Sequence, residues 1–241
     1  MRIGITGASG KIGRQLVQTL RMHHQVISFG REDSDIEWAM GVMPSQLQLK
    51  EVDVLIHLAW SLKDRRNDFH LNVGGTGSLS FAAKRSGVPF LFISSVAASS
   101  ISNYGLAKAE AEKLVIENDG QIVRVGLIPK VNRYSKFSTK LIGVYPNLPK
   151  CIRITPYKTF EEFILEWVSK ENNNSVSQKY ILLSSEKWGP KKVFSGTSRV
   201  MLPLPYTLIR FVIYLARNFS LRARNLEDAL NSLITITSET K

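Results

Sequence analysis

Short apolar runs alternate with amphipathic segments along the first half of the chain. The run RIGIT, at residues 2–6, is apolar and β-branched, and after it Ile12, Leu16 and Leu20 recur at helical spacing. Further apolar runs of strand length occupy residues 25–29, 53–59, 89–95 and 121–127. Helical segments follow at residues 72–87, where the glycines stand at the helix start, and at residues 103–118. Alternating strands and helices predict an α/β fold built on a doubly wound parallel sheet.

The spacing changes in two places. Residues 31–52 are too few for a full strand and two helices, so we expect a reduced third strand there. After about residue 130 the alternation fades and prolines become frequent. The later elements we expect are helices at residues 159–170, 204–219 and 225–236 and a strand at residues 179–185. The sequence therefore predicts a domain over residues 1–130 and a small C-terminal substrate-binding lobe over residues 131–241, partly folded back on the sheet.

Three glycines follow the first apolar run at intervals of three. Gly7 comes directly after the run, Gly10 stands at the turn, and Gly13 lies in the helix that follows. Unpaired N–H groups and the helix dipole attract phosphate to a helix start, and glycine is needed where the backbone turns sharply or approaches closely. Because strand, glycines and helix occur in this order, the pattern predicts a dinucleotide-binding turn rather than a loop without function.

The residues after the second predicted strand bear on the choice of cofactor. An acid at this point binds the ribose hydroxyls of NAD, whereas a base suits the 2′-phosphate of NADP. The strand is followed by Gly30 and then by Arg31, which favours NADP. Glu32 and Asp33 follow at once, so NAD remains the alternative.

Tyr104 and Lys108 form the candidate catalytic pair. They are four residues apart at the start of a predicted helix and so share one side of it. The phenol of tyrosine has an ordinary pKa near 10, so acid–base work at neutral pH needs a nearby positive charge, which Lys108 would supply. The buried strand before this helix ends in Ser94 and Ser95, and a serine there can bind the same substrate oxygen as the tyrosine.

The order of these motifs resembles that of the extended short-chain dehydrogenases/reductases, in the branch of NAD-dependent nucleotide-sugar epimerases, dehydratases and reductases. The resemblance covers about residues 1–130, and it implies a Rossmann fold and, commonly in this family, pairing into a homodimer. The motifs that carry it are GASGKIG (7–13), HLAW (57–60), NVGGTG (72–77), FISS (92–95), YGLAK (104–108) and IVRVG (122–126).

The resemblance implies a role for each matching residue. Tyr104 would be the general acid/base and Lys108 its electrostatic partner, while Ser95, or alternatively Ser94, would bind the reacting oxygen. Asn72 would steady the helix beside the site. The residues expected to contact the cofactor are Gly7, Ser9, Gly10, Lys11, Ile12, Gly13, Arg31, Leu58, Ala59, Tyr104 and Lys108.

One departure from the family concerns the loop that shapes the sugar pocket. Tyr104 follows Ser95 by only nine positions, so this loop is shorter than in the extended branch of the family. We expect an NAD(P)-dependent enzyme acting on a nucleotide-linked or lipid-diphosphate-linked sugar, with the substrate and the choice of epimerisation, dehydration or reduction left open. The alternative is a non-catalytic NAD(P)-binding regulator or scaffold of the same fold.

The net charge of +12 favours anionic partners. It fits a substrate carrying a diphosphate, for which the candidate cations are Arg133, Lys136, Arg153 and Arg199. The basic residues are scattered and no zinc-finger or RNA-binding motif accompanies them, so we do not expect nucleic acid as a partner.

Other features bear on location. Cys151 is the single cysteine, no signal peptide is recognised before the first strand, and no metal-ligand spacing occurs, so we expect a cytoplasmic protein without a metal. The most apolar stretch, residues 202–219, is interrupted by Arg210 and by prolines, and predicts a buried or amphipathic helix rather than a membrane span. Weak association with a membrane surface is its minority interpretation.

Overall fold

A seven-stranded parallel sheet forms the centre of the molecule. The computed structural model describes residues 1–62, 68–129, 142–147, 152–172, 180–183, 186–188, 200–216, 220, 226 and 228. The strands lie in the order β3-β2-β1-β4-β5-β6-β9, and every neighbouring pair is parallel. They are β1 (Arg2–Thr6), β2 (Gln25–Gly30), β3 (Ile36–Glu37), β4 (Val54–His57), β5 (Phe90–Ser95), β6 (Gln121–Val125) and β9 (Tyr180–Leu183).

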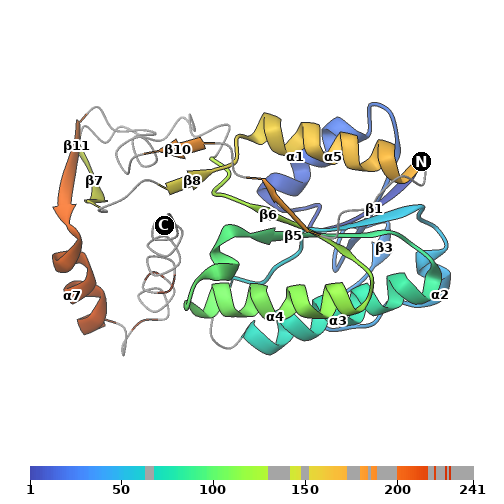
Figure 1. The fold of residues 1–241 in the computed structure, drawn as a ribbon, viewed down its shortest axis with the longest axis horizontal. Coiled ribbons are helices and arrows are strands. Elements are labelled where there is room, and N and C mark those ends of the chain that lie inside the picture. Colours follow the sequence, from blue (N-terminus) through green and yellow to red (C-terminus); the bar gives the residue numbers. More distant parts are fainter. Residues whose placement is uncertain are drawn as a thin grey trace.

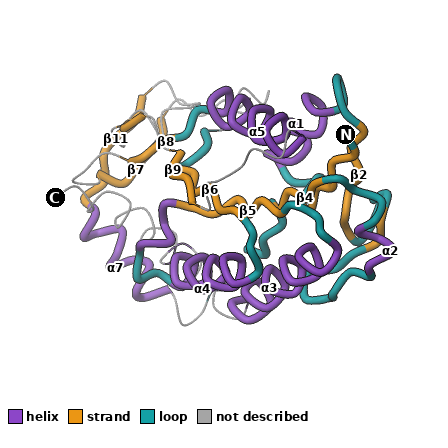
Figure 2. The backbone as a smooth tube through the Cα atoms, turned by 45° about the vertical axis from the view of Figure 1, so that its right-hand side comes forward, coloured by secondary structure: helices purple, strands orange, loops and turns teal. Residues whose placement is uncertain are grey.

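Helices cover both faces of the sheet (Figures 1 and 2). One face carries α1 (Lys11–Leu20) and α5 (Tyr157–Asn172), and the other carries α3 (Asp68–Ser86) and α4 (Asn103–Glu117). The short α2 (Gln46–Leu49) lies beside α3. These three layers confirm the predicted doubly wound parallel sheet.

Each face of the sheet has its own apolar core. On one side Leu16 and Leu20 of α1 pack in one cluster with Phe160 and Ile164 of α5 and with alternate strand residues. On the other side α3 and α4 pack against the remaining strand residues in a second cluster. All four residues of β4 are buried, as expected for a central strand covered on both faces.

The reduced third strand is confirmed, since β3 has only two residues. The predicted start of the following helix was wrong. Helix α3 begins at Asp68 rather than at residue 72, so its glycines lie inside the helix. The reason is close packing: a Cβ atom at Gly75 would lie 2.6 Å from the Met40 sulfur, and one at Gly77 would lie 2.7 Å from Leu114.

The remaining described elements lie outside the seven-stranded sheet, on the side where β5 ends (Figure 1). They are β7 (Ile142–Asn147) paired with β11 (Val200–Pro205), β8 (Ile152–Ile154) paired with β10 (Glu186–Trp188), and α7 (Tyr206–Ala216).

Two predictions about the second half of the chain need adjustment. The helix expected from residue 204 begins at Tyr206, because the proline-containing residues before it form β11. The helix expected at residues 225–236 lies outside the described residues, apart from Leu226 and Asp228. The domain boundary at residue 130 remains a prediction, since α5 and β9 come after it and pack with the sheet.

Candidate functional site

The glycine turn joins the end of β1 to the start of α1. Gly7 has a φ of +74°, and a Cβ atom there would lie 2.7 Å from the backbone nitrogen of Ala59. A Cβ atom at Gly13 would overlap the carbonyl oxygen of Gly7. Both positions therefore require glycine, one for its backbone conformation and both for the close approach of neighbouring backbone.

The start of α1 suits an anionic group. Gly10 is the N-cap residue and offers no side-chain cap, and the first turn contains no acidic residue. Ser9, Gly10 and Lys11 are exposed, and Ile12 is half-buried. A helix start with no side-chain cap attracts phosphate through its N–H groups and dipole, so the turn fits the pyrophosphate of a dinucleotide.

The segment after β2 carries the residues predicted to meet the ribose. Arg31, Glu32 and Asp33 are all exposed. The next acid, Asp35, accepts hydrogen bonds of 2.8 Å from both the backbone nitrogen and the hydroxyl of Ser28, and these bonds lower the pKa of its carboxyl group. Asp35 is thus engaged within its own strand–loop connection, and Arg31 is the first charged side chain after β2.

A buried hydrogen-bond chain fixes the end of β4 next to the glycine turn. The Thr6 hydroxyl accepts a hydrogen bond of 3.1 Å from the Ala59 backbone and shares one of 2.7 Å with His57 Nδ1. His57 Nε2 shares another, of 3.0 Å, with the Thr76 hydroxyl. Burial lowers the pKa of His57 to about 3, so the ring is neutral and joins two strands to α3. Leu58, like Ala59, is half-buried beside this chain.

Asn72 holds the segment that follows β4. Its side-chain oxygen accepts a 2.8 Å hydrogen bond from the Ser61 backbone nitrogen, and its side-chain nitrogen donates a 2.9 Å hydrogen bond to the Ser61 carbonyl. Asn72 lies in α3 and is buried. The asparagine therefore ties the chain just beyond Trp60 to the helix beside the candidate site.

The short connection between β5 and α4 brings Tyr104 close to the end of the sheet. After β5 the chain forms a single 3₁₀ turn, η1 (Val96–Ser99), and α4 begins four residues later. Tyr104 packs against Val96 and Ala97 of that turn. A Cβ atom at Gly105 would overlap the Ala97 carbonyl oxygen, so the glycine after the tyrosine allows this tight connection.

Lys108 is buried beneath aromatic rings. Its side-chain nitrogen lies 3.7 Å from the centre of the Trp60 ring, 4.5 Å from that of Phe92 and 6.0 Å from that of Tyr104. The same nitrogen donates a 3.0 Å hydrogen bond to the Ile93 carbonyl. Burial lowers the pKa of Lys108 to about 7 and outweighs the opposing effect of the Glu112 carboxylate.

The two candidate serines differ in their surroundings. Ser94 is buried and donates a 2.5 Å hydrogen bond to the Glu112 carboxylate. Ser95 is half-buried, and its hydroxyl accepts a 3.1 Å hydrogen bond from the Ala97 backbone. An accepting hydroxyl keeps its proton to donate, so Ser95 is the better candidate to bind a substrate oxygen.

Three residues that support the site were not predicted from the sequence: Glu112, Arg124 and Asp228. Glu112 receives two hydrogen bonds from Arg124, of 2.9 and 2.7 Å, as well as the one from Ser94. Asp228 is buried and accepts hydrogen bonds from the backbone nitrogens of Asn103 and Tyr104, of 2.8 and 3.3 Å. Glu112 follows Lys108 by four residues, a spacing that could have revealed it, whereas no local signal points to Asp228.

Of the four cations predicted to bind a diphosphate, the structure describes one. Arg153 lies in β8 with a half-buried side chain. The other three, Arg133, Lys136 and Arg199, lie outside the described residues, as does Cys151.

One family model matches the first part of the chain by sequence. Residues 1–97 match a family model described as the RmlD substrate binding domain. None of the curated proteins is a significant sequence match.

Solved structures are similar over most of the chain. A dTDP-4-dehydrorhamnose reductase from Bacillus anthracis str. Ames, in complex with NADP, has a TM-score of 0.70 at 18% identity, over 86% of this chain and 85% of that chain. A dTDP-4-dehydrorhamnose reductase ortholog from Clostridium acetobutylicum has a TM-score of 0.68 at 17% identity, over 96% and 99%.

A third likeness is to a UDP-glucuronic acid 4-epimerase from Bacillus cereus, in complex with UDP-glucuronic acid and NAD. Its TM-score is 0.64 at 18% identity, over 85% of this chain and 86% of that chain. At such identities the structures show a shared fold. The chain therefore has the Rossmann fold that these enzymes share, in agreement with the resemblance to the extended short-chain dehydrogenases/reductases expected from the sequence.

Proposed function

We propose that this chain is an NAD(P)-dependent enzyme that reduces or epimerises a sugar linked to a nucleotide or to a lipid diphosphate. The observation that carries the proposal is the arrangement around α4. Tyr104 and Lys108 lie one helical turn apart, and Tyr104 packs against the turn that directly follows Ser95 at the end of β5. The likeness to reductases and an epimerase of nucleotide sugars supports it. So does the glycine turn, whose geometry fits a dinucleotide.

In the proposed mechanism Tyr104 exchanges a proton with the reacting hydroxyl or carbonyl of the sugar. Lys108 stabilises the phenolate form of Tyr104 by its charge, which the surrounding rings shield from water. Ser95 donates a hydrogen bond to the same sugar oxygen. A bound nicotinamide supplies or accepts the hydride.

Trp60 orients the pair in this proposal. Its ring meets the Tyr104 ring edge-on, with the ring centres 6.1 Å apart, while its face covers the Lys108 ammonium. Aromatic edge-to-face contact and cation–π attraction both restrict the two side chains.

NADP is the proposed cofactor, with NAD as the alternative, because Arg31 is the first charged side chain after β2. The proposed substrate carries a diphosphate, linked either to a nucleoside or to a lipid. The net charge of +12 supports either linkage.

The Tyr104→Phe variant tests the mechanism. Because the variant lacks the exchangeable proton, we expect turnover of a dTDP-4-keto sugar with NADPH, or of a UDP-sugar with NAD, to fall by roughly 10²–10⁴-fold. NADPH binding, measured by titration calorimetry, should be nearly unchanged. Tyr214→Phe, which makes the same change at an exposed tyrosine of α7, is the matched control and should turn over like the wild type.

Wild-type turnover in Tyr104→Phe would contradict the proposed role. The second candidate, a non-catalytic NAD(P)-binding protein, is favoured by the short connection between Ser95 and Tyr104. Cofactor binding by the wild type without turnover of any nucleotide sugar would support that candidate instead.

A further inference from the structure

The helix α7 exposes an apolar side that no described part of the chain covers. Ile213 is its only buried residue, and Tyr206, Ile209 and Ala216 are half-buried, so these four mark the side that faces the protein. A separate group of large apolar residues is about half exposed, namely Leu208 at 50%, Phe211 at 59%, Val212 at 56% and Leu215 at 54%.

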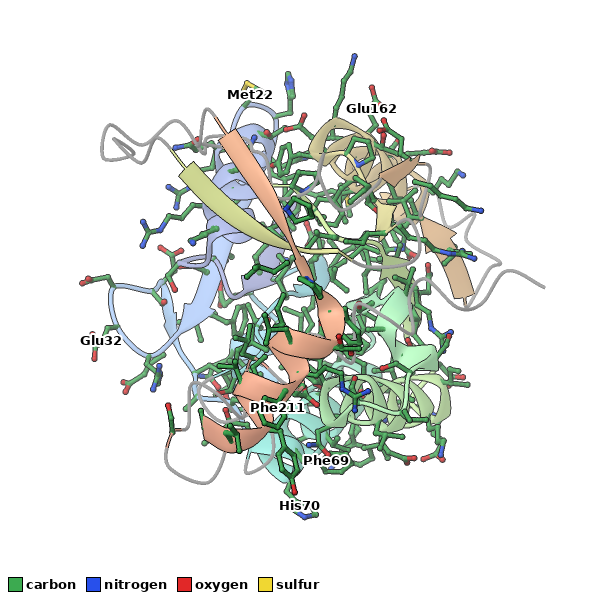
Figure 3. The ribbon with its side chains drawn as sticks, turned by 90° about the vertical axis from the view of Figure 1, so that its left-hand side faces the viewer. Met22, Glu32, Phe69, His70, Glu162 and Phe211 are labelled. Carbon is green, nitrogen blue, oxygen red and sulfur yellow. The ribbon has the colours of Figure 1, made fainter. Side chains whose placement is uncertain are left out.

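The exposed residues form a stripe. Positions 208, 211, 212 and 215 follow the spacing i, i+3, i+4, i+7, which brings them to one side of a helix. Arg210 and Tyr214 are also exposed and lie between this stripe and the inward side. Figure 3 faces this end of the molecule and shows α7, on which Phe211 is labelled, in front of the rest of the fold. A contiguous apolar stripe of this kind marks a surface for a partner or a membrane.

The charges in the sequence before, within and after α7 favour a membrane over a second copy of the chain as the occupant of this stripe. From residue 187 to residue 226 the sequence contains no aspartate or glutamate, and it contains eight lysines and arginines. Four of them, all arginines, fall within residues 206–224. A second copy of the chain would bring the same positive charge against itself and would be repelled, whereas an anionic surface would be attracted.

We propose that α7 docks the protein on the surface of a membrane that contains anionic lipids. The stripe of Leu208, Phe211, Val212 and Leu215, the docking stripe, enters the boundary between headgroups and acyl chains. Arg210, which is exposed on α7, and the net positive charge of the chain attract the anionic headgroups. Tyr214 has an apolar ring and a polar hydroxyl, which suits the same boundary. None of the helices in the described part of the chain is long and apolar enough to span a membrane.

Co-sedimentation of the full chain with vesicles tests this docking. We expect binding to phosphatidylcholine vesicles that contain phosphatidylglycerol, weaker binding to phosphatidylcholine alone, and release at high salt. The Phe211→Glu/Leu215→Glu variant should bind the anionic vesicles at least about tenfold more weakly. Met43→Glu/Leu47→Glu is the matched control, because these side chains are 51% and 75% exposed and the double variant gains the same charge away from α7.

A second variant separates the charge from the apolar stripe. Replacing Arg217, Arg222 and Arg224 together by glutamine should weaken binding to anionic vesicles and leave the small binding to phosphatidylcholine unchanged. All substituted side chains on α7 are exposed, so the Phe211→Glu/Leu215→Glu variant should keep the wild-type melting temperature, which thermal denaturation checks.

Three results would overturn the proposal. One is the absence of vesicle binding by the wild type, and another is equal binding by the Phe211→Glu/Leu215→Glu variant. The third is a wild-type dimer in light scattering that this variant converts to a monomer, which would assign the docking stripe to a second copy. Because vesicle binding is measured without substrate, its outcome is independent of the catalytic proposal.

Discussion

At the scale of single residues, the most constrained group of the candidate site is the Lys108 ammonium. It lies over the faces of Trp60 and Phe92 and is bound by one backbone carbonyl. Burial disfavours its charge, while the ring faces and Glu112 favour it. The result is a lysine whose pKa of about 7 falls close to neutral pH.

This pKa makes the stability of the fold depend on pH in a defined window. The folded-state pKa of Lys108, about 7, lies below the ordinary lysine value of 10.5, so between them the unfolded chain binds more protons than the folded one. The free energy of unfolding should therefore rise with pH in this window. For Lys108→Met this contribution is missing.

Urea unfolding at several pH values from about 7 to 9 measures the effect. The wild type should gain up to about 1 kcal/mol per pH unit relative to Lys108→Met, because other titrating groups are common to both proteins and cancel. Parallel pH profiles for the two proteins would show that Lys108 titrates at its ordinary value. His57, with a pKa of about 3, acts in a separate, acidic window.

At the scale of the elements, the start of α4 depends on two side chains from different parts of the chain. The Ser102 hydroxyl accepts a hydrogen bond of 3.0 Å from the Gly105 backbone nitrogen. Asp228 accepts the bonds from the first two backbone nitrogens of the helix. A carboxylate at a helix start also complements the positive end of the helix dipole. The backbone that carries Tyr104 is therefore held by Ser102, which directly precedes the helix, and by Asp228 from the later part of the chain.

Replacing Asp228 by alanine should loosen this helix start. We expect the free energy of unfolding in urea to fall by about 0.5–2 kcal/mol, the usual cost of losing a cap. Asp228→Asn should lose less, because its amide oxygen still accepts a hydrogen bond. The control is Glu162→Ala, an exposed acid on α5, which should change stability by less than about 0.5 kcal/mol.

An element could be predicted where neighbouring residues decide its position, and not where contacts with residues distant in sequence decide it. The strands and the glycine turn follow from local patterns, and the structure confirms them within one or two residues at most boundaries. The start of α3 was misjudged because Gly75 and Gly77 serve contacts with Met40 and Leu114, which are distant in sequence. Glycine lowers helix propensity locally, and tertiary packing overrides it.

The same reasoning separates the predictable and unpredictable parts of the site. The pair Tyr104 and Lys108 lies on one helix, so its spacing alone predicts a shared side. The cap from Asp228 joins positions more than a hundred residues apart, and no local pattern encodes it. The aromatic cover of Lys108 by Trp60 likewise depends on the meeting of a loop after β4 with α4.

At the scale of the whole molecule, the sheet is completed by segments from beyond residue 130. Helix α5 covers the sheet beside α1, and β9 pairs with the outer edge of β6. The Trp167 ring nitrogen also donates a 2.7 Å hydrogen bond to the Gln121 side chain. The first part of the chain therefore has, on its own, a sheet face covered only by α1 and an open strand edge.

A fragment of residues 1–130 should consequently not fold as a stable unit. Loss of α5 would expose the apolar cluster around Leu16 and Leu20, and loss of β9 would leave β6 unpaired. We expect no cooperative thermal transition by circular dichroism and strong binding of a hydrophobic dye. A cooperative transition like that of the full chain would mean that the first 130 residues fold independently.

The bond between Asp228 and the start of α4 also has a consequence in time. A protein emerges from the ribosome amino end first, and its early segments begin to fold before the later ones exist. The helix with Tyr104 and Lys108 is among the early segments, yet one of its two caps comes from residue 228. A nascent chain would thus hold all the candidate catalytic residues before the Asp228 contact to the backbone of Tyr104 can form. Completion of the site is in this way tied to the synthesis of residue 228.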